Sequence, residues 1–120
     1  MDSKSLGAWG EEKAARYLRL HGYSILERNF SCCAGELDIV AKKGKFIVFA
    51  EVKLRKNAEF AEAREFVTYA KQRRIIATAQ LYLSTHDWDL QPRFDVIEVY
   101  APDGVQSRKV QINHIKDAFQ

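Results

Sequence analysis

The sequence predicts an α/β domain in which helices flank a central mixed β-sheet. Three observations lead to this prediction: an amphipathic helical pattern near the start, two runs of β-forming residues around Gly44, and a long helical stretch before another β-rich run. The predicted order is helix, three strands, helix and two strands. We expect one domain over residues 1–120, because 47% of the residues are hydrophobic and no linker or internal repeat interrupts the chain.

The first helix is predicted at residues 6–20. Apolar residues recur there at helical spacing, and His21-Gly22 supplies a stop signal. Residues 23–26 are then predicted to form a short strand, and the polar residues 29–35 a loop.

Two adjacent strands are the clearest feature of the sequence. Residues 36–41 and 46–53 are rich in β-forming residues, and Gly44 between them can adopt the positive φ of a hairpin turn. Both faces of the second run are apolar, which is typical of a central strand that is covered on both sides.

The remaining elements alternate between helix and strand. A long helix is predicted at residues 60–83, a strand at 93–100, a short strand at 110–112 and a helical tail at 115–119. Asp95 lies among apolar neighbours, and we expect it to be structural and paired with an arginine rather than a metal ligand.

Composition excludes some classes of function. The net charge of +3 only weakly favours a polyanionic partner. No apolar run approaches the ~20 residues of a membrane helix, and the first residues lack the apolar stretch of a secretory signal. The two cysteines, Cys32 and Cys33, are adjacent and fit a reducing compartment. We therefore expect a cytoplasmic protein without membrane contact.

The predicted hairpin places two carboxylates side by side. If the turn is centred between Gly44 and Lys45, Asp38 lies opposite Glu51 and Lys53 shares their face, whereas a one-residue slip would turn Asp38 away. Paired carboxylates in a half-buried sheet repel each other, so a positive charge is expected between them. Lys53 can offset one charge. A divalent cation can offset more, and hard oxygen ligands favour Mg²⁺ or Mn²⁺.

Glu11 is a third candidate ligand. It shares a helical stripe with Ala14, Ala15 and Leu18, on the face expected to pack against the sheet, whereas Glu12 points outward. The alternative is that an acidic residue early in the helix complements the helix dipole. Taken together with the two hairpin carboxylates, the functional interpretation is favoured.

These groups are the ones that phosphodiester hydrolysis requires. We expect Glu11, Asp38 and Glu51 to bind Mg²⁺ or Mn²⁺, which activates a water and stabilises the transition state. Lys53 would position or deprotonate that water, or neutralise charge on the phosphate. The sequence therefore predicts a metal-dependent nuclease with Glu11, Asp38, Glu51 and Lys53 as its catalytic residues.

Segments of fixed internal spacing extend over nearly the whole chain. They are Gly7-x-x-Gly10-Glu11-x-x-Ala14-x-x-Tyr17-Leu18, Gly22-Tyr23-x-Ile25-Leu26-x-Arg28-Asn29, Gly35-Glu36-Leu37-Asp38, Val48-Phe49-Ala50-Glu51-Val52-Lys53, Arg93-Phe94-Asp95-Val96 and His114-Ile115. With these segments the sequence resembles the YraN-like family of uncharacterised bacterial proteins.

That family is assigned to the PD-(D/E)xK nuclease superfamily, which is related to restriction endonucleases and archaeal Holliday-junction resolvases. The resemblance implies a restriction-endonuclease-like core and a DNA substrate more than an RNA one. It implies that Asp38 is the aspartate of the pattern, that Glu51-Val52-Lys53 is its E-x-K, and that Glu11 is the helix glutamate of resolvase-like members. The substrate of the family is not established, so the resemblance implies the fold more strongly than an activity.

Basic residues around the candidate site are predicted to contact nucleic acid. They are Lys42, Lys43, Arg55, Lys56, Lys71 and Arg74. The alternative is an ordinary solvated surface. Lys71 is further expected to reach the site from the long helix.

Two other functions remain open at this point. One is a nucleic-acid-binding module that keeps the nuclease scaffold without turnover, and it would gain nothing from a buried set of three acids. The other is a protein-interaction adaptor, which would show no salt-sensitive binding of nucleic acid. A homodimer is an expectation by analogy with nucleases that act on two strands.

Overall fold

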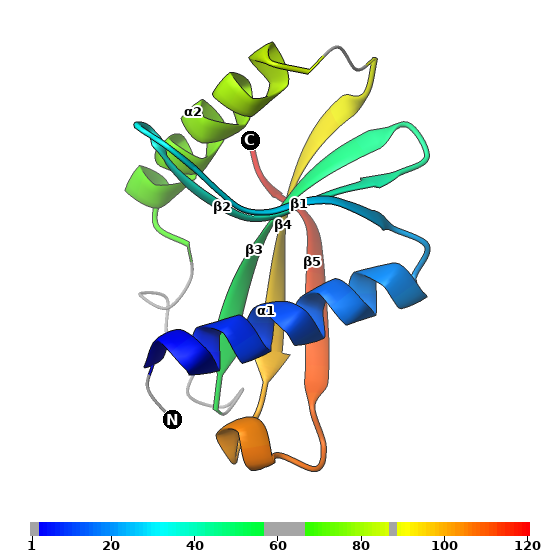
Figure 1. Ribbon diagram of the computed structural model, residues 1–120, viewed down its shortest axis with the longest axis vertical. Coiled ribbons are helices and arrows are strands. Elements are labelled where there is room, and N and C mark those ends of the chain that lie inside the picture. Colours follow the sequence, from blue (N-terminus) through cyan, green and yellow to red (C-terminus); the bar gives the residue numbers. More distant parts are fainter. Residues whose placement is uncertain (1–2, 57–66, 87–88) are drawn as a thin grey trace.

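The computed structural model describes residues 3–56, 67–86 and 89–120, which form a five-stranded sheet with two α-helices (Figure 1). The elements in chain order are α1 (Ser3–Leu20), β1 (Ser24–Cys32), β2 (Gly35–Lys43), β3 (Phe46–Arg55), α2 (Tyr69–Ser84), β4 (Gln91–Tyr100), the 3₁₀ turn η3 (Gly104–Gln106) and β5 (Gln111–Phe119). This order confirms the predicted α/β class and the predicted succession of helices and strands.

The sheet is mixed and has β3 at its centre. The strand order is β1-β2-β3-β4-β5; β3 and β4 are parallel, and the other neighbouring strands are antiparallel. A parallel pair requires a crossover, and α2 lies in the connection between β3 and β4. On β3, Val48 and Ala50 pack in the hydrophobic cluster that includes α1, while Ile47 and Phe49 pack in the cluster that includes α2. The predicted central strand, covered on both faces, is therefore confirmed.

α1 packs against the sheet through the stripe that predicted its inner face. Ala14, Ala15 and Leu18 of this stripe are fully buried, whereas Glu11 is only partly buried. Glu11 is therefore a partly buried acid at the edge of a helix face that is otherwise apolar. Neither helix of the described ranges has the length and apolar character that crossing a membrane demands.

Two segments that were predicted as loop and helix are strands. β1 continues to Cys32, which pairs with Gly35, so the predicted loop at 29–35 is wrong except for a turn at residues 33–34. Its polar residues are tolerated because β1 is an edge strand with many exposed positions. β5 continues to Phe119, so the predicted helical tail at 115–119 is also wrong. Its backbone pairs with β4, and Phe119 stacks on Phe94 at 5.3 Å between ring centroids.

The second helix begins later than predicted. α2 starts at Tyr69, and the side chain of Thr68 caps it by accepting a hydrogen bond from the backbone N–H of Lys71 at 3.2 Å. Residues 67–68 are therefore not helical, and residues 60–66 of the predicted helix lie outside the described residues. The cap fixes where the side chain of Lys71 leaves the helix.

Asp95 is structural, as expected, and its arginine is Arg93. The fully buried carboxylate accepts hydrogen bonds from Arg93 at 2.8 and 2.9 Å and from His114 Nε2 at 2.6 Å. Arg93 also donates to the hydroxyl of Tyr23 at 2.7 Å. Burial alone would raise the pKa of Asp95, but the hydrogen bonds from His114 and Arg93 outweigh it and hold the pKa below its ordinary value. This network joins β4, β5 and Tyr23, the residue before β1.

Gly35 provides a test of how the β1–β2 hairpin packs on α2. Its φ is +151°, and a Cβ atom there would lie 3.0 Å from Oγ1 of the fully buried Thr78. Gly35→Ala should lower the free energy of unfolding by about 2 kcal/mol, measured by urea denaturation, because of backbone strain and overpacking. The control is Gly7→Ala in α1, where a Cβ meets no atom within 4 Å. That variant should gain about 0.5–1 kcal/mol, and equal stability of the two variants would contradict the packing.

Candidate functional site

The candidate site begins where the pairing of β2 with β3 stops. The backbone pairs run through the hairpin in the predicted register as far as Ile39 and Ala50. Asp38 and Glu51 are the next residues of that register. Oδ2 of Asp38 accepts a hydrogen bond from the backbone N–H of Val52 at 2.8 Å. A carboxylate thus takes the place of a main-chain carbonyl at the point where the two strands separate.

The two carboxylates repel each other in a partly desolvated position. The side chain of Glu51 is only 6% exposed. Burial raises the pKa of Asp38 to about 7, and the neighbouring charge of Glu51 adds to this effect, while the hydrogen bond from Val52 opposes it. The charge of Glu11 contributes in the same direction as Glu51. The negative charge of Asp38 and Glu51 is therefore only partly compensated by hydrogen bonds and by solvent.

Two lysines from different elements face this charge. Nζ of Lys71, on α2, lies 2.6 Å from Oε1 of Glu51. Burial would lower the pKa of Lys71, but the hydrogen bond and charge of Glu51 outweigh it, so the pKa is raised. Burial and the charge of Lys71 lower the pKa of Lys53, although Glu51 and Asp38 act against them. The expectation that Lys71 reaches the site from the helix is thus met by a direct ion pair.

Glu11 approaches the same region from α1. Burial raises its pKa, while a hydrogen bond with the side chain of Asn29 and the charge of Arg28 lower it; the charges of Glu36 and Glu51 raise it further. Asn29 adopts a φ of +55° within β1, a conformation that asparagine tolerates better than most residues. Its strand neighbours pair with the residues on either side of Asp38. Asn29 therefore lies between Glu11 and the hairpin carboxylates.

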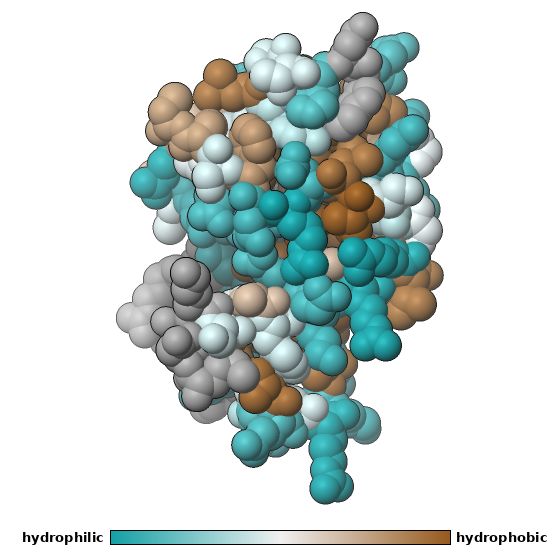
Figure 2. Space-filling view, in the orientation of Figure 1, coloured by the Kyte–Doolittle hydropathy of each residue, from teal (hydrophilic) through white to brown (hydrophobic). Residues whose placement is uncertain are grey.

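A cleft of about 320 Å³ opens onto these groups. Its lining residues are Gly35, Glu36, Asp38, Glu51, Lys71, Arg74 and Ile75. On the molecular face seen in Figure 2, hydrophilic side chains gather between α2 and α1. The cleft brings acidic residues of β2 and β3 together with basic residues of α2, which suits a ligand that carries anionic groups and cations at once.

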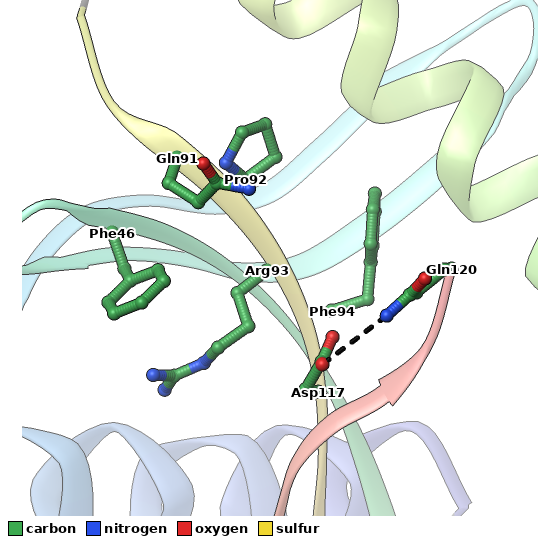
Figure 3. A pocket seen from close by; sticks show the side chains of 7 residues that line it. All are labelled: Phe46, Gln91, Pro92, Arg93, Phe94, Asp117 and Gln120. Atoms are coloured by element: carbon green, nitrogen blue, oxygen red, sulfur yellow. Dashed lines mark hydrogen bonds between the residues drawn. The ribbon is translucent and has the colours of Figure 1, made fainter.

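A larger cavity lies away from this chemistry. It has a volume of about 570 Å³ and is formed by the ends of β3, β4 and β5 (Figure 3). Phe46 and the guanidinium of Arg93 lie against each other there, 5.1 Å from the ring centroid, and Arg93 is already bound to Asp95. The single carboxylate of the lining is Asp117, which accepts a hydrogen bond from Gln120 at 3.4 Å. Paired acids are absent from its lining, so size alone does not identify the functional site.

The other predicted nucleic-acid contacts are spread over the molecule. Lys42 and Lys43 lie at the far end of β2, where Nζ of Lys43 donates to the carbonyl of His21 at 2.8 Å. Arg55 is buried and ion-paired with Glu98, so its position gives no support to contact with a phosphate. Lys56 is exposed just beyond β3. Among the six predicted residues, Lys71 and Arg74 line the cleft.

Two residues of the site were missed by sequence reasoning. Glu36 precedes Asp38 by two positions on a strand, a spacing that places both on one face and could have indicated it. Asn29 was assigned to a loop, and its tolerance of positive φ was the available signal. Within residues 3–56, 67–86 and 89–120, no three His, Cys, Asp or Glu side chains are already grouped closely enough to hold a metal ion.

Comparison with known proteins yields one family. The profile of the uncharacterised protein family UPF0102 matches residues 10–99. A UPF0102 protein of Clostridium perfringens is 45% identical over 119 residues, covering 98% of this chain and 96% of the relative. A UPF0102 protein of Caldanaerobacter subterraneus is 44% identical over 99% of this chain and 98% of its own length. A UPF0102 protein of Syntrophomonas wolfei is 47% identical, with coverage of 98% and 99%.

The raised pKa of Asp38 predicts how stability depends on pH. Its pKa is about 7 in the folded protein and 3.8 ordinarily. The protonated carboxyl of Asp38 therefore contributes fully to the stability of the folded protein below about pH 4, and this contribution is lost as the pH rises through 7. Asp38→Asn removes the charge and keeps an acceptor for the N–H of Val52. Without metal at pH 8, the variant should be more stable by about 2 kcal/mol, a value reduced for partial exposure. Urea denaturation of the variant and the parent at pH 4 and pH 8 measures the difference in their free energies of unfolding. The same difference at both pH values would contradict the assignment.

Proposed function

The chain belongs to the uncharacterised protein family UPF0102, and we propose that it is a metal-dependent nuclease that hydrolyses phosphodiester bonds in nucleic acid. The family name states no activity. The observation that carries the proposal is the pair of opposed carboxylates, Asp38 and Glu51, at an open cleft beside Lys53 and Lys71. A fold gains nothing in stability from burying two like charges side by side, so their placement points to a ligand.

The donor chemistry of the site fits a hard divalent cation. Asp38 and Glu51 would hold Mg²⁺ or Mn²⁺ through carboxylate oxygens, and Glu11 would join them from α1. Burial and the repulsion from Glu51 raise the pKa of Asp38, and a bound cation would relieve both by stabilising the charged form. When bound, it would supply a Lewis acid that activates water and stabilises charge on the phosphate.

The basic residues of the cleft have separate roles in this proposal. Lys53 follows Glu51 by two positions on β3 and faces the same side. Its ammonium would orient the attacking water or neutralise charge that develops on the phosphate. Lys71 and Arg74, on consecutive turns of α2, would bind the phosphates on either side. DNA is proposed as the substrate because of the resemblance to the PD-(D/E)xK superfamily, which is itself part of the proposal.

One observation favours the alternative, a nucleic-acid-binding module without turnover. Among the described residues, the acids do not yet form a group of three that could hold a metal. Such a module predicts salt-sensitive binding of nucleic acid that is unaffected by divalent cations. If the protein is a nuclease, the divalent cation should change how tightly nucleic acid binds and should also lead to its cleavage.

A cleavage assay separates the two functions. Single-stranded, duplex, flapped and four-way-junction DNA, and RNA, are incubated with Mg²⁺ or with Mn²⁺. The parent should cut at least one substrate, and Asp38→Asn and Lys53→Ala should each reduce the rate by about 100-fold or more, because each removes a group used in the transition state. Asp103→Asn, an exposed carboxylate beside η3, is the matched control and should cut like the parent. Cutting by Asp38→Asn at the parental rate would refute the assigned site.

A further inference from the structure

Lys71 and a divalent cation would compete for the carboxylate of Glu51. In the structure, Nζ of Lys71 contacts Oε1 of Glu51 at 2.6 Å. Glu51 is almost fully buried, so its charge requires a counter-ion at hydrogen-bond distance. A cation that is bound by both Asp38 and Glu51 must be coordinated by this same carboxylate. Two cations that are held by one carboxylate repel each other strongly where the dielectric is low.

We propose that Lys71 is an exchangeable counter-ion of Glu51: it holds Glu51 in the metal-free protein, leaves it when a divalent cation binds, and then contacts a phosphate of the nucleic acid. This inference rests on the proposed function, since it assumes that Glu51 is a metal ligand. The exchange of Lys71 would couple metal binding to substrate binding, which the metal ligands by themselves would not do.

The location of Lys71 suits it for exchange better than that of Lys53. Lys53 and Glu51 belong to the same strand, so their separation is fixed by the backbone. Lys71 extends from α2, a separate element, and its side chain is 40% exposed. A long lysine side chain with this access to water can change rotamer without disturbing the core. Lys71 also lines the cleft itself, so its ammonium stays within the cleft after it leaves Glu51.

The exchange gives the cation two effects on the substrate. It neutralises the carboxylates, which otherwise repel phosphate, and it releases one ammonium that was occupied by Glu51. Nucleic acid should therefore bind more tightly when the cation is present. By thermodynamic linkage, the cation should bind more tightly, by the same factor, when nucleic acid is present.

The experiment compares Lys71→Met with Arg74→Met. Both remove one positive charge from the same cleft, but the ion pair with Glu51 belongs to Lys71. Mn²⁺ affinity is measured by isothermal titration calorimetry on the free proteins. Lys71→Met should bind Mn²⁺ about fivefold more tightly than the parent, the size of a partly exposed ion pair. Arg74→Met removes a charge of the cleft but no contact with Glu51, so its gain in Mn²⁺ affinity should be clearly smaller than that of Lys71→Met. Lys71→Gln, which keeps a polar side chain, should reproduce the gain and guards against a folding defect of the methionine variant.

The second measurement follows a fluorescent phosphorothioate DNA duplex by anisotropy, with and without Mn²⁺. In the parent and in Arg74→Met, Mn²⁺ should strengthen DNA binding. In Lys71→Met it should do so by a clearly smaller factor, because the cation still neutralises the carboxylates but has no ammonium to release. If the parent binds Mn²⁺ and Lys71→Met binds it no more tightly, the exchange is overturned while the proposed metal site stands. If the parent binds no Mn²⁺ at all, the exchange is overturned together with the proposed function.

Discussion

The repulsion between the carboxylates of Asp38 and Glu51 is the constraint on which the rest of the site depends. It arises because the pairing of β2 with β3 stops at Ile39 and Ala50, and the next two residues that face each other are both acids. Two contacts offset part of this repulsion: the N–H of Val52 donates to Asp38, and the ammonium of Lys71 pairs with Glu51. Burial and the charge of Glu51 nevertheless raise the pKa of Asp38 to about 7. A site that keeps this much unrelieved charge is suited to a divalent cation.

The rest of the fold holds this strained position in place. β3 is buried on both faces, so Glu51 cannot move away from the sheet without disturbing two hydrophobic clusters. On the other side of β3, the Arg93–Asp95–His114 network fixes β4 and β5 under α1. α2 carries Lys71 to the cleft, and Thr68 caps the start of this helix. The site thus combines a rigid acidic pair with a lysine from an independently placed helix.

The central strands and the carboxylate register could be predicted from sequence because the signals are local. A glycine turn between two β-rich runs fixes which residues face each other, and apolar residues on both faces of residues 46–53 indicate a central strand. The edge strands were harder, because β1 is polar and β5 carries little periodicity. Their pairing depends on β2 and β4, which the local sequence does not contain. The same limit applies to Asn29, whose place in the site follows from the pairing of β1 with β2.

Basic residues show the difference between composition and position. Arg55 and Lys56 are neighbours in the sequence, yet Arg55 is buried with Glu98 and Lys56 is exposed. The charge of a segment therefore predicted a nucleic-acid surface more broadly than the structure supports. Lys71, by contrast, meets Glu51 in an ion pair that joins two separate elements. Such a contact depends on tertiary packing, so the expectation that Lys71 reaches the site rested on the family resemblance and not on a local sequence pattern.

Anomalous diffraction from crystals of the protein soaked in Mn²⁺ would show whether a cation binds the carboxylate pair. We expect a manganese peak within coordination distance of both the Asp38 and the Glu51 carboxylates, with Nζ of Lys71 moved away from Oε1 of Glu51. A well-diffracting soaked crystal with no manganese at this pair, and with Lys71 still bound to Glu51, would contradict this expectation.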